Sequence, residues 1–595
     1  MMRVIVRDWG WLGIVAAILT GGASGTIGDA WGVRDYDEGD LAVLQDIIDL
    51  NNLTIDPLDL GLQLWSNDRL VFLDITGNTS LQLTQLPENL GDLDHLIELA
   101  LNNHHLTEIP PSVGNLMFLG SLSLRENQLT GLPTQLGNLT TLINLDAAYN
   151  QLTSLPENLE ALTLLLTINL SHNQLTELPN TIGSLTGLFS LDVSHNEITE
   201  YPGSLSQITG LGWIDVSWNQ IAEIPGSITA NTGLQNLDVS GNLLTSFPGE
   251  MGGFTQLYTF RCSDNQITGL PYSLPYVTPL FDLDVSFNLL TALPDGFDLL
   301  QNLIRLDISD NEFASFPLAI TSLTQVIKLD LSGNQIDALP ESLWSLPVLQ
   351  ELHVRDNQIQ DLSENLGQLQ SLIKLNVAHN PIPSLPLSLN TLSLLTDLNV
   401  SGCDLTELPA EWSGLSSLLL LNLSDNAITE LPPGIGSLEA LQVLNISGNY
   451  LIAIPPSLAD MASLWLVYLG NNSLYCFDGE QMIENIPAFL LNGGNPWIDG
   501  LYQQDCTVAG CTDPLAYQFS TDFLVDDGSC IYPFSGDVNG DHTTDILDII
   551  LIVSIIIDGD IPSDAQLFAG DLNSDGSLNI LDVVLIIQSI LMNGY

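Results

Sequence analysis

The sequence predicts an α/β solenoid of stacked repeats, followed by a small all-α module at its C-terminal end. Residues 96–463 repeat with a period of 23 residues, in 16 units without a gap. The chain then ends in a stretch that occurs twice, at 536–559 and at 570–594. Each copy is a loop dense in Asp and Asn followed by an apolar segment. A repeating unit of this length buries its apolar residues only by stacking on its neighbours, so the array predicts one continuous core.

The amino-acid composition is strongly acidic, which restricts the classes of partner. The 595 residues include 71 Asp and Glu against 10 Lys and Arg, for a formal net charge of −61, and 45% are hydrophobic. A nucleic-acid backbone or an anionic membrane surface would repel this charge. We therefore expect no nucleic-acid partner. The charge suits a soluble exported protein, a salty medium or extensive use of Ca²⁺.

The N-terminal segment, residues 1–25, is interpreted as a signal peptide. Arg3 and Arg7 precede an apolar run at 9–20, and small residues follow it. The run is too short to cross a bilayer comfortably, and the sequence Ala-Ser-Gly fits a cleavage site. An uncleaved anchor or a buried N-terminal segment is the alternative. No later run contains 18 uninterrupted apolar residues, so we expect no membrane span and a secreted or cell-surface protein.

An N-terminal helical cap is predicted over residues 26–69. Within it, residues 37–52 begin with acids and continue with regularly spaced apolar residues. The apolar positions are Leu41, Leu44, Ile47 and Ile48. This spacing predicts an amphipathic helix. A stacked array exposes apolar residues at its first unit, and the helix stands where it would cover them.

Residues 70–475 contain the repeats, with the consensus L-x-x-L-x-L-x-x-N-x-L-T-x-L-P-x-x-I-G-x-L-T-x. This pattern resembles the leucine-rich repeat family. The resemblance implies a horseshoe, with one short parallel strand per unit on the concave face and leucines directed into a stacked core. The recurring Asn would satisfy backbone groups where the chain leaves each strand. Cys403 occupies one of these Asn positions.

Cys262 and Cys403 lie in units six steps apart and are interpreted as structural thiols. Strands stack at ~4.8 Å, so the two cysteines would lie roughly 29 Å apart. A disulfide requires Cα atoms within ~7 Å of each other. Cys262 takes an inward leucine position, and we expect both thiols to remain unpaired.

The concave face offers a candidate ligand surface, because residues flanking the core leucines point outward there. Half of the Lys and Arg residues of the chain fall on a few units of this face. The ligand-face candidates are Arg261, Arg305, Lys328, His353, Arg355 and Lys374. The acids interleaved with them are Asp282, Asp284, Asp307, Asp330 and Glu351. The pattern fits either cross-strand ion pairing or a recognition patch for a polar or anionic ligand on units 257–394.

We predict that the chain is not an enzyme. Asp284, Asp307 and Asp330 would lie ~5 Å apart on neighbouring strands, close to the carboxylate separation of retaining glycosidases. However, the Asp row follows the repeat consensus and lies on an open, curved face, with no evident pocket to raise one pKa or exclude water. His172 and His195 belong to a set of histidines scattered along the sequence, and nothing resembles a Ser/His/Asp set or a two-His metal motif.

A C-terminal cap and a Cys-bracketed spacer are predicted over residues 476–535. Four cysteines cluster there, which in an exported chain favours two disulfides. The preferred pairing is Cys476–Cys506 with Cys511–Cys530, one of three connectivities. Residues 509–532 resemble short Cys-bracketed segments near the C-termini of large exported bacterial proteins.

The repeated tail, residues 536–595, carries oxygen donors at the spacing of calcium-binding loops. Asp or Asn occupies loop positions one, three, five, nine and twelve in each copy, and position seven supplies a backbone carbonyl. The first loop comprises Asp537, Asn539, Asp541, Thr543, Asp545 and Asp548. The second comprises Asp571, Asn573, Asp575, Ser577, Asn579 and Asp582. Two Ca²⁺ ions are expected, and the first site would be the weaker because His542 stands where the second loop has Gly576.

The paired loop–helix motifs resemble the dockerin module. The resemblance implies two calcium motifs related by pseudo-twofold symmetry, and a cohesin domain on another protein as the partner. It also assigns the partner contacts to loop positions ten and eleven. Those residues are Ile546 and Leu547 in the first copy and Ile580 and Leu581 in the second. Because both copies carry the same pair, either face of the module could dock.

Together these features predict an exported, non-catalytic binding protein. Its repeats would recognise a protein or glycan ligand on the concave face, and its tail would attach the chain to a cohesin-bearing scaffold or surface protein. Two alternatives stay open. One is a non-catalytic component of a polysaccharide-degrading, cellulosome-like complex, and the other is a signalling scaffold.

Overall fold

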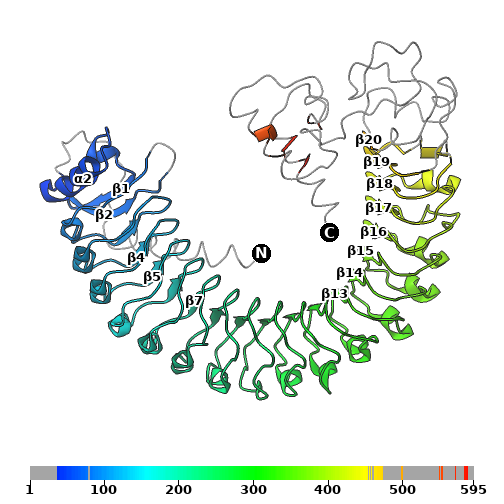
Figure 1. The fold of residues 1–595 in the computed structure, drawn as a ribbon, viewed down its shortest axis with the longest axis horizontal. Coiled ribbons are helices and arrows are strands. Elements are labelled where there is room, and N and C mark those ends of the chain that lie inside the picture. The colour runs from blue at the N-terminus through cyan, green and yellow to red at the C-terminus, as the bar shows by residue number, and fades with distance from the viewer. Residues whose placement is uncertain are drawn as a thin grey trace, which may run out of the picture.

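The computed structural model describes residues 36–77, 81–452, 454–455, 457–458, 461–472, 497–499 and, near the C-terminus, 549, 551–553, 570, 572, 582–583 and 585–586. The described repeats form a horseshoe, with strands along its concave side and short 3₁₀ helices along its convex side (Figure 1). The predicted α/β solenoid is confirmed.

A single 20-stranded sheet runs through the solenoid. β1 pairs with β2 antiparallel, and the later strands pair in parallel, each with the one before it. The strands are β1 (Leu62–Ser66), β2 (Arg69–Asp74), β3 (Glu98–Ala100), β4 (Ser121–Ser123), β5 (Asn144–Asp146), β6 (Thr167–Asn169), β7 (Ser190–Asp192), β8 (Trp213–Asp215), β9 (Asn236–Asp238), β10 (Thr259–Arg261), β11 (Asp282–Asp284), β12 (Arg305–Asp307), β13 (Lys328–Asp330), β14 (Glu351–His353), β15 (Lys374–Asn376), β16 (Asp397–Asn399), β17 (Leu420–Asn422), β18 (Val443–Asn445), β19 (Leu466–Tyr468) and β20 (Trp497–Asp499). From β3 to β19 paired residues lie one repeat of 23 residues apart, as Leu306 and Leu329 do.

Short 3₁₀ helices carry the chain back along the convex side of most units. They are η1 (Pro57–Asp59), η2 (Leu90–Asp92), η3 (Pro111–Asn115), η4 (Thr134–Asn138), η5 (Leu159–Ala161), η6 (Asn180–Ser184), η7 (Gly203–Gln207), η8 (Gly226–Ala230), η9 (Leu274–Tyr276), η10 (Phe297–Leu299), η11 (Leu318–Ser322), η12 (Glu341–Ser345), η13 (Glu364–Gln368), η14 (Leu387–Thr391) and η15 (Pro433–Ser437). The consensus Pro caps many of them. Pro133, with φ −67° and ψ 144°, holds the extended backbone that precedes η4.

The buried aliphatic side chains join in one continuous core that extends from Val43 to Leu469. Asn residues secure the turns that leave the strands. The side-chain amide of Asn334 donates to the carbonyls of Ile308, Leu331 and Ser332 at 3.0–3.1 Å. Its side-chain carbonyl accepts the backbone N–H of Phe313 at 3.0 Å. Each Asn of this kind links its own unit to the preceding one.

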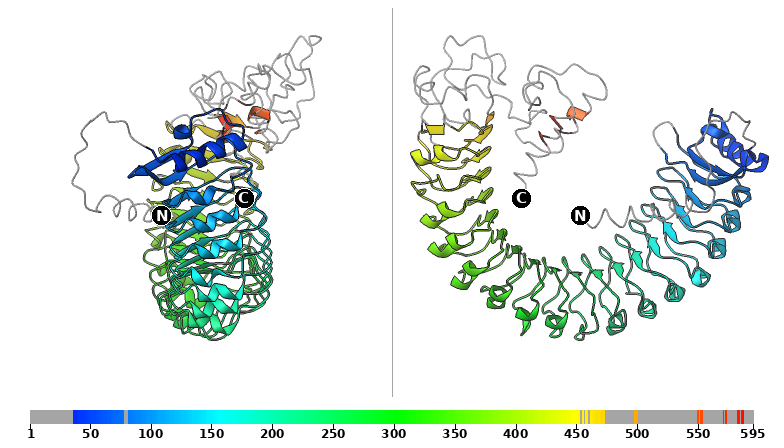
Figure 2. Two further views of the ribbon diagram at one scale, coloured as in Figure 1. Left: turned by 90° about the vertical axis from the view of Figure 1, so that its left-hand side faces the viewer. Right: turned by 180° about the vertical axis from the view of Figure 1, so that it is seen from behind.

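Helix α2 (Glu38–Leu50) and the β1–β2 hairpin close the N-terminal end of the sheet (Figure 2). The predicted cap helix is therefore present. Its buried apolar face differs by one position from the expected one, because Val43 is buried and Leu41 only half-buried.

A buried ion pair fastens this helix to the hairpin. The carboxylate of Asp40 is fully buried and contacts the Arg69 guanidinium at 2.9 Å. It also accepts the backbone N–H of Leu70 at 2.7 Å. Arg69 additionally pairs with Asp94, so one cation connects the helix, the hairpin and the first repeats. Hydrogen bonding to Asp40, together with charge attraction to Asp40 and Asp94, raises the pKa of Arg69 further above its usual value.

The C-terminal segment is described at a few positions only. Ile552, Val583 and Ile586 are buried together there, so apolar residues from the two copies of the tail share one small core. Among the described residues, no helix has both the length and the apolar character needed to span a bilayer.

Candidate binding site on the concave face

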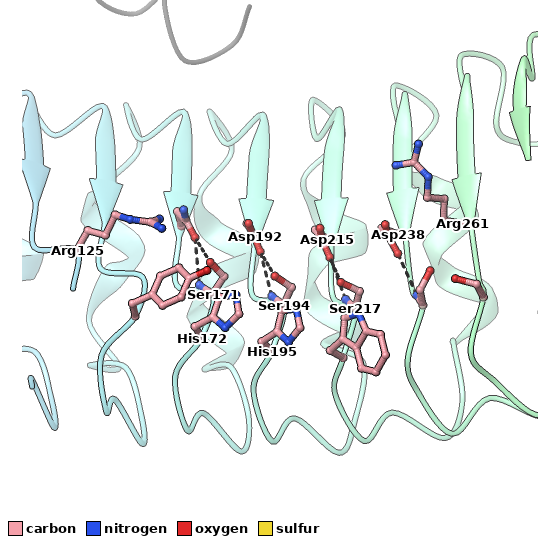
Figure 3. Close-up of a pocket in the computed structure, with 15 residues that line it drawn as sticks. Arg125, Ser171, His172, Asp192, Ser194, His195, Asp215, Ser217, Asp238 and Arg261 are labelled. Carbon is pink, nitrogen blue, oxygen red and sulfur yellow. Dashed lines mark hydrogen bonds between the residues drawn. The ribbon is translucent and has the colours of Figure 1, made fainter. Parts of the chain in front are cut away.

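Three acidic side chains lie side by side on the concave face, at the ends of β7, β8 and β9 (Figure 3). Asp192, Asp215 and Asp238 occupy one register position on neighbouring strands. Asp215 accepts both the backbone N–H and the hydroxyl of Ser217, at 3.0 and 2.6 Å. No ion pair reaches any of the three acids within the described residues. We call this group the carboxylate row.

Burial and the neighbouring acids raise the pKa of the central acid, Asp215. Burial, followed by repulsion from Asp238 and Asp192, raises the pKa of Asp215 from its usual value near 3.8 to about 7. Farther along the same register position, burial and the neighbours Asp330 and Asp284 raise the pKa of Asp307 to about 6. Asp215 is therefore only partly ionised at neutral pH, and the repulsion from its neighbours acts in full only at higher pH.

A second row, of aromatic rings, runs along the loops that follow β5 to β8. The ring centroids of Tyr149 and His172 lie 4.0 Å apart, those of His172 and His195 4.1 Å, and those of His195 and Trp218 5.7 Å. The Arg125 guanidinium lies 4.4 Å from the Tyr149 ring centroid. We call these four rings the ring row. Each ring belongs to the residue directly before a consensus Asn.

The backbone of the ring row is left-handed, with φ between 53° and 56° at all four residues. This conformation costs an aromatic residue of order 1 kcal/mol or more, whereas glycine adopts it freely. Gly241 occupies the next position of the same series, at φ 63°. A Cβ on Gly241 would lie 2.6 Å from the Trp218 ring, so the glycine also makes room for that ring.

The two rows border a hollow of about 460 Å³. Its walls include Asn169, Asp215, His195, Trp218 and Arg261. The sequence interpretation was wrong on two points here. His172 and His195 are not scattered, because the 23-residue period brings them together, and the concave face does contain a pocket with a carboxyl of raised pKa. The period of residues 149, 172, 195 and 218 is the signal that could have revealed the ring row.

The geometry does not match glycoside hydrolysis. A glycosidase places its two carboxyl groups on either side of the scissile bond. The carboxylate row instead projects from one face of one sheet, so its acids would meet a substrate from a single side.

The six basic candidates lie farther along the concave face, on or beside β10 to β15. Four of them have acidic partners. Arg261 contacts Asp282 at 2.6 Å, Lys374 contacts Glu351 at 3.3 Å, and Arg355 contacts its neighbour Asp356 at 2.6 Å. His353 approaches Glu351 at 3.9 Å, and burial lowers the pKa of His353, which favours its neutral form.

The remaining two, Arg305 and Lys328, are paired in register on β12 and β13. Within the described part of the chain, neither forms an ion pair. Cross-strand ion pairing therefore accounts for some of the basic residues and leaves these two adjacent cations available.

Both upstream cysteines are buried free thiols, as expected. Cys403 donates through Sγ to the carbonyls of Val377 and Ser401, at 3.2 and 3.5 Å, and so fills part of the role of Asn. Burial raises the pKa of Cys403 to about 11, which keeps its thiol protonated. No group of acids, histidines or cysteines in the described residues is arranged to hold a metal ion.

The predicted calcium loops lie almost wholly outside the described residues. Of the twelve expected metal donors only Asp582 is described, and its side chain is fully buried beside Val583. The expected partner residues Ile546, Leu547, Ile580 and Leu581, and the Cys476–Cys506 and Cys511–Cys530 pairings, also lie outside them. The donor set consists of oxygen atoms alone, which suits a hard cation such as Ca²⁺.

Family models agree with both resemblances. Leucine-rich repeat models match residues 163–221, 325–346, 393–451 and 417–474. The model of the dockerin type I domain matches residues 535–591. Dockerin type I domains bind calcium and imply a cohesin partner, and leucine-rich repeats imply binding to proteins. No curated protein matches the chain.

Solved structures similar to this chain include plant and bacterial proteins. The plant peptide hormone receptor RGFR1, in complex with RGF2, is 29% identical at a TM-score of 0.58, over 68% of this chain and 67% of that one. The Arabidopsis receptor kinase HAESA, in complex with the peptide hormone IDA and the co-receptor SERK1, is 25% identical at a TM-score of 0.55. The match covers 73% of this chain and 82% of that one. The Leptospira interrogans protein LIC12759 is 26% identical at a TM-score of 0.48, over 77% of this chain and 97% of that one.

Proposed function

We propose that this chain, which carries leucine-rich repeats and a dockerin type I domain, is an exported, non-catalytic adaptor. The solenoid recognises a protein or glycan ligand on its concave face, and the dockerin docks the chain to a cohesin-bearing scaffold or surface protein. The pairing of two binding modules in one chain is the observation that carries the proposal. Both matched families are typically non-catalytic.

Two Ca²⁺ ions would be held by the two loops, through Asp537 to Asp548 and through Asp571 to Asp582. The bound ions supply folding free energy to a module that is too small to fold on its apolar core alone. The Ile546–Leu547 and Ile580–Leu581 pairs would provide two similar apolar surfaces for a cohesin.

A protein or peptide is the favoured ligand of the solenoid. The receptors RGFR1 and HAESA, with TM-scores above one half, are described in complex with peptide hormones. A horseshoe of this kind presents a long row of strand side chains, which suits an extended chain. Arg305 and Lys328, without acidic partners in the described residues, would contribute where the ligand is polar or anionic.

Capture by a cohesin tests the dockerin half of the proposal. The full chain and a chain ending at 532 are incubated with an immobilised type I cohesin in calcium and in EDTA. We expect capture of the full chain in calcium only. Ile546→Asp with Ile580→Asp should abolish capture while leaving calcium binding measurable by calorimetry. Capture of the shortened chain, or capture in EDTA, would refute this half.

The solenoid half is tested with partners pulled down by the full chain from the native exoproteome. Partners retained by the chain ending at 532 bind the solenoid. Arg305→Ser, Lys328→Ser and Arg355→Ser are then combined in one variant. If no retained partner loses affinity for this variant, the basic candidates have a structural role only.

A second candidate function is a non-catalytic component of a polysaccharide-degrading complex. The dockerin match favours it, because such modules also attach polysaccharide-degrading enzymes to scaffolds. The two functions predict different proteins on the scaffold to which the chain is attached. Glycoside hydrolases found on the same cohesin scaffold would support the complex, and hydrolysis of polysaccharides by the purified chain would contradict both functions.

A further inference from the structure

We propose that the hollow between the carboxylate row and the ring row binds a cationic segment of a partner protein. Arg or Lys side chains of the segment would be seated on Asp192, Asp215 and Asp238 (Figure 3). This inference rests on the proposed function, because it assigns a ligand class to one part of the solenoid.

The charge of the carboxylate row is not needed to build the fold. Asn399 occupies the register position of Asp215 in a later unit, and its side-chain carbonyl accepts the backbone N–H and hydroxyl of Ser401 at 3.1 and 2.8 Å. Asp215 makes the same two bonds to Ser217. An amide can therefore accept the same hydrogen bonds without charge repulsion between strands. Three adjacent carboxylates lower the stability of the fold and make the surface negative.

The ring row adds a second feature at the same place. The repeat makes this position left-handed in every unit, and other units hold residues such as Asp310 or Gly333 there. An aromatic ring at this position in four consecutive units is particular to residues 149–218. The rings and the acids both line the one hollow.

One polar group in the hollow is left without a partner. Ser194 and Ser217 each donate their hydroxyl to the neighbouring Asp. Ser240 donates only its backbone N–H to Asp238. Ser240 is 6% exposed, and its Oγ has no hydrogen-bond partner in the described structure. A buried hydroxyl of this kind is normally satisfied, and a ligand group at Asp238 would satisfy it.

The lining favours a cation over a sugar. The ring faces of His172 are covered by Tyr149 and His195, so the middle of the ring row offers edges and no open face for a sugar to stack on. Burial and repulsion from His195 lower the pKa of His172, so this ring adds little positive charge at neutral pH. Carboxylates spaced by ~4.8 Å accept hydrogen bonds from successive guanidinium or ammonium groups.

A pair of triple variants provides the test. Asp192→Asn, Asp215→Asn and Asp238→Asn are combined in one chain. The control combines Asp284→Asn, Asp307→Asn and Asp330→Asn, three acids at the same register position on β11 to β13. Both variants lose the same charge, and both keep an oxygen that can accept the bonds of the following residues. Full chains in calcium are titrated with fluorescein-labelled penta-arginine at about 150 mM salt, where screening is effective beyond ~8 Å.

We expect the first variant to bind the peptide at least about tenfold more weakly than the native chain, and the control to stay within about twofold. Native affinity should rise from about pH 6 to about pH 8, as Asp215 loses its proton. The charged and titratable groups that line the hollow with Asp215 are Asp192, Asp238, His172, His195, Tyr149, Arg125 and Arg261. The pH response should be lost in the first variant and kept in the control.

Equal weakening in both variants would show that the peptide responds only to net charge, and would overturn the proposal. Absence of native binding would overturn it too. Binding of cellohexaose in the hollow, without binding of the peptide, would assign the site to a glycan instead. Cohesin capture is measured on the same samples, and its retention would show that the adaptor function stands even where the cationic ligand fails.

Discussion

Asp215 and Asn399 make the same pair of hydrogen bonds in two different units, yet only one of them carries a charge. The consensus position accepts either side chain because the bonds need an acceptor oxygen and nothing more. The electrostatic environment then decides the consequence. At the residue scale, the repeat fixes geometry and leaves charge free to vary along the concave face.

Replacing Asp215 by Asn should stabilise the protein above neutral pH. The folded pKa of Asp215, about 7, lies above its usual value of 3.8, so the folded chain binds more protons than the unfolded chain between these values. Stability therefore falls as pH rises through this window. The full shift would be worth about 4 kcal/mol, which partial exposure reduces to about 1–2 kcal/mol.

Urea denaturation of Asp215→Asn should show this gain near pH 8 and almost none near pH 4. Asp307→Asn should behave in the same direction with a smaller gain, because the pKa of Asp307 is about 6. A gain that is independent of pH would contradict the electrostatic origin of the effect.

Asn334→Ala should cost much more stability than Cys403→Ala, although both residues occupy the same repeat position. Asn334 makes four hydrogen bonds, and its loss leaves buried backbone groups unsatisfied at a cost of about 2–4 kcal/mol. Cys403 makes two weak bonds, and the Ile382 N–H is already satisfied by the Asn380 carbonyl. We expect Cys403→Ala to cost about 1 kcal/mol. Equal urea midpoints for the two variants would contradict this account.

At the element scale, the strands and convex turns were predictable because each unit repeats the same apolar and turn residues. Helix α2 was predictable from its amphipathic spacing, but the β1–β2 hairpin was not recognised. The use of Val43 instead of Leu41 was also missed, because helix rotation depends on the surface that the helix covers. That rotation follows from Asp40, a polar residue whose burial depends on Arg69 across the cap.

Asp40→Ala should destabilise the N-terminal cap by about 3 kcal/mol. The variant loses a buried ion pair and leaves the Leu70 N–H without its acceptor. Glu38→Ala, at an exposed site in the first turn of the same helix, should cost only tenths of a kcal/mol. Hydrogen exchange would report the difference as loss of protection in α2 and β2, with the distant repeats unchanged. A uniform loss of protection along the solenoid would mean that the cap and the repeats unfold as one unit.

At the scale of the whole molecule, the concave face is divided by charge. Within the described residues, the acids on β7 to β9 form no ion pair, whereas the acids on β11 to β13 share their strands with the adjacent cations Arg305 and Lys328. Farther on, Asn376, Asn399, Asn422 and Asn445 take the position of the acids. The sequence revealed the basic residues because a few cations stand out in an acidic chain. The hollow could not be recognised in the sequence, because Asp is common throughout the chain and the rings come together only when the units stack.

Removal of calcium should affect the dockerin and leave the solenoid folded. The solenoid core is built from aliphatic side chains and Asn bonds, and its described residues include no metal cluster, so EDTA should leave its circular dichroism and urea midpoint nearly unchanged. The dockerin, in contrast, is expected to need bound Ca²⁺ for its folding free energy, so its capture by cohesin should be lost in EDTA and recovered on adding Ca²⁺. The chain ending at 532 is the matched control, because it should show the EDTA-insensitive transition alone. Loss of the solenoid signal in EDTA would mean that metal also supports the repeats, whereas cohesin capture that persists in EDTA would remove calcium from the docking step.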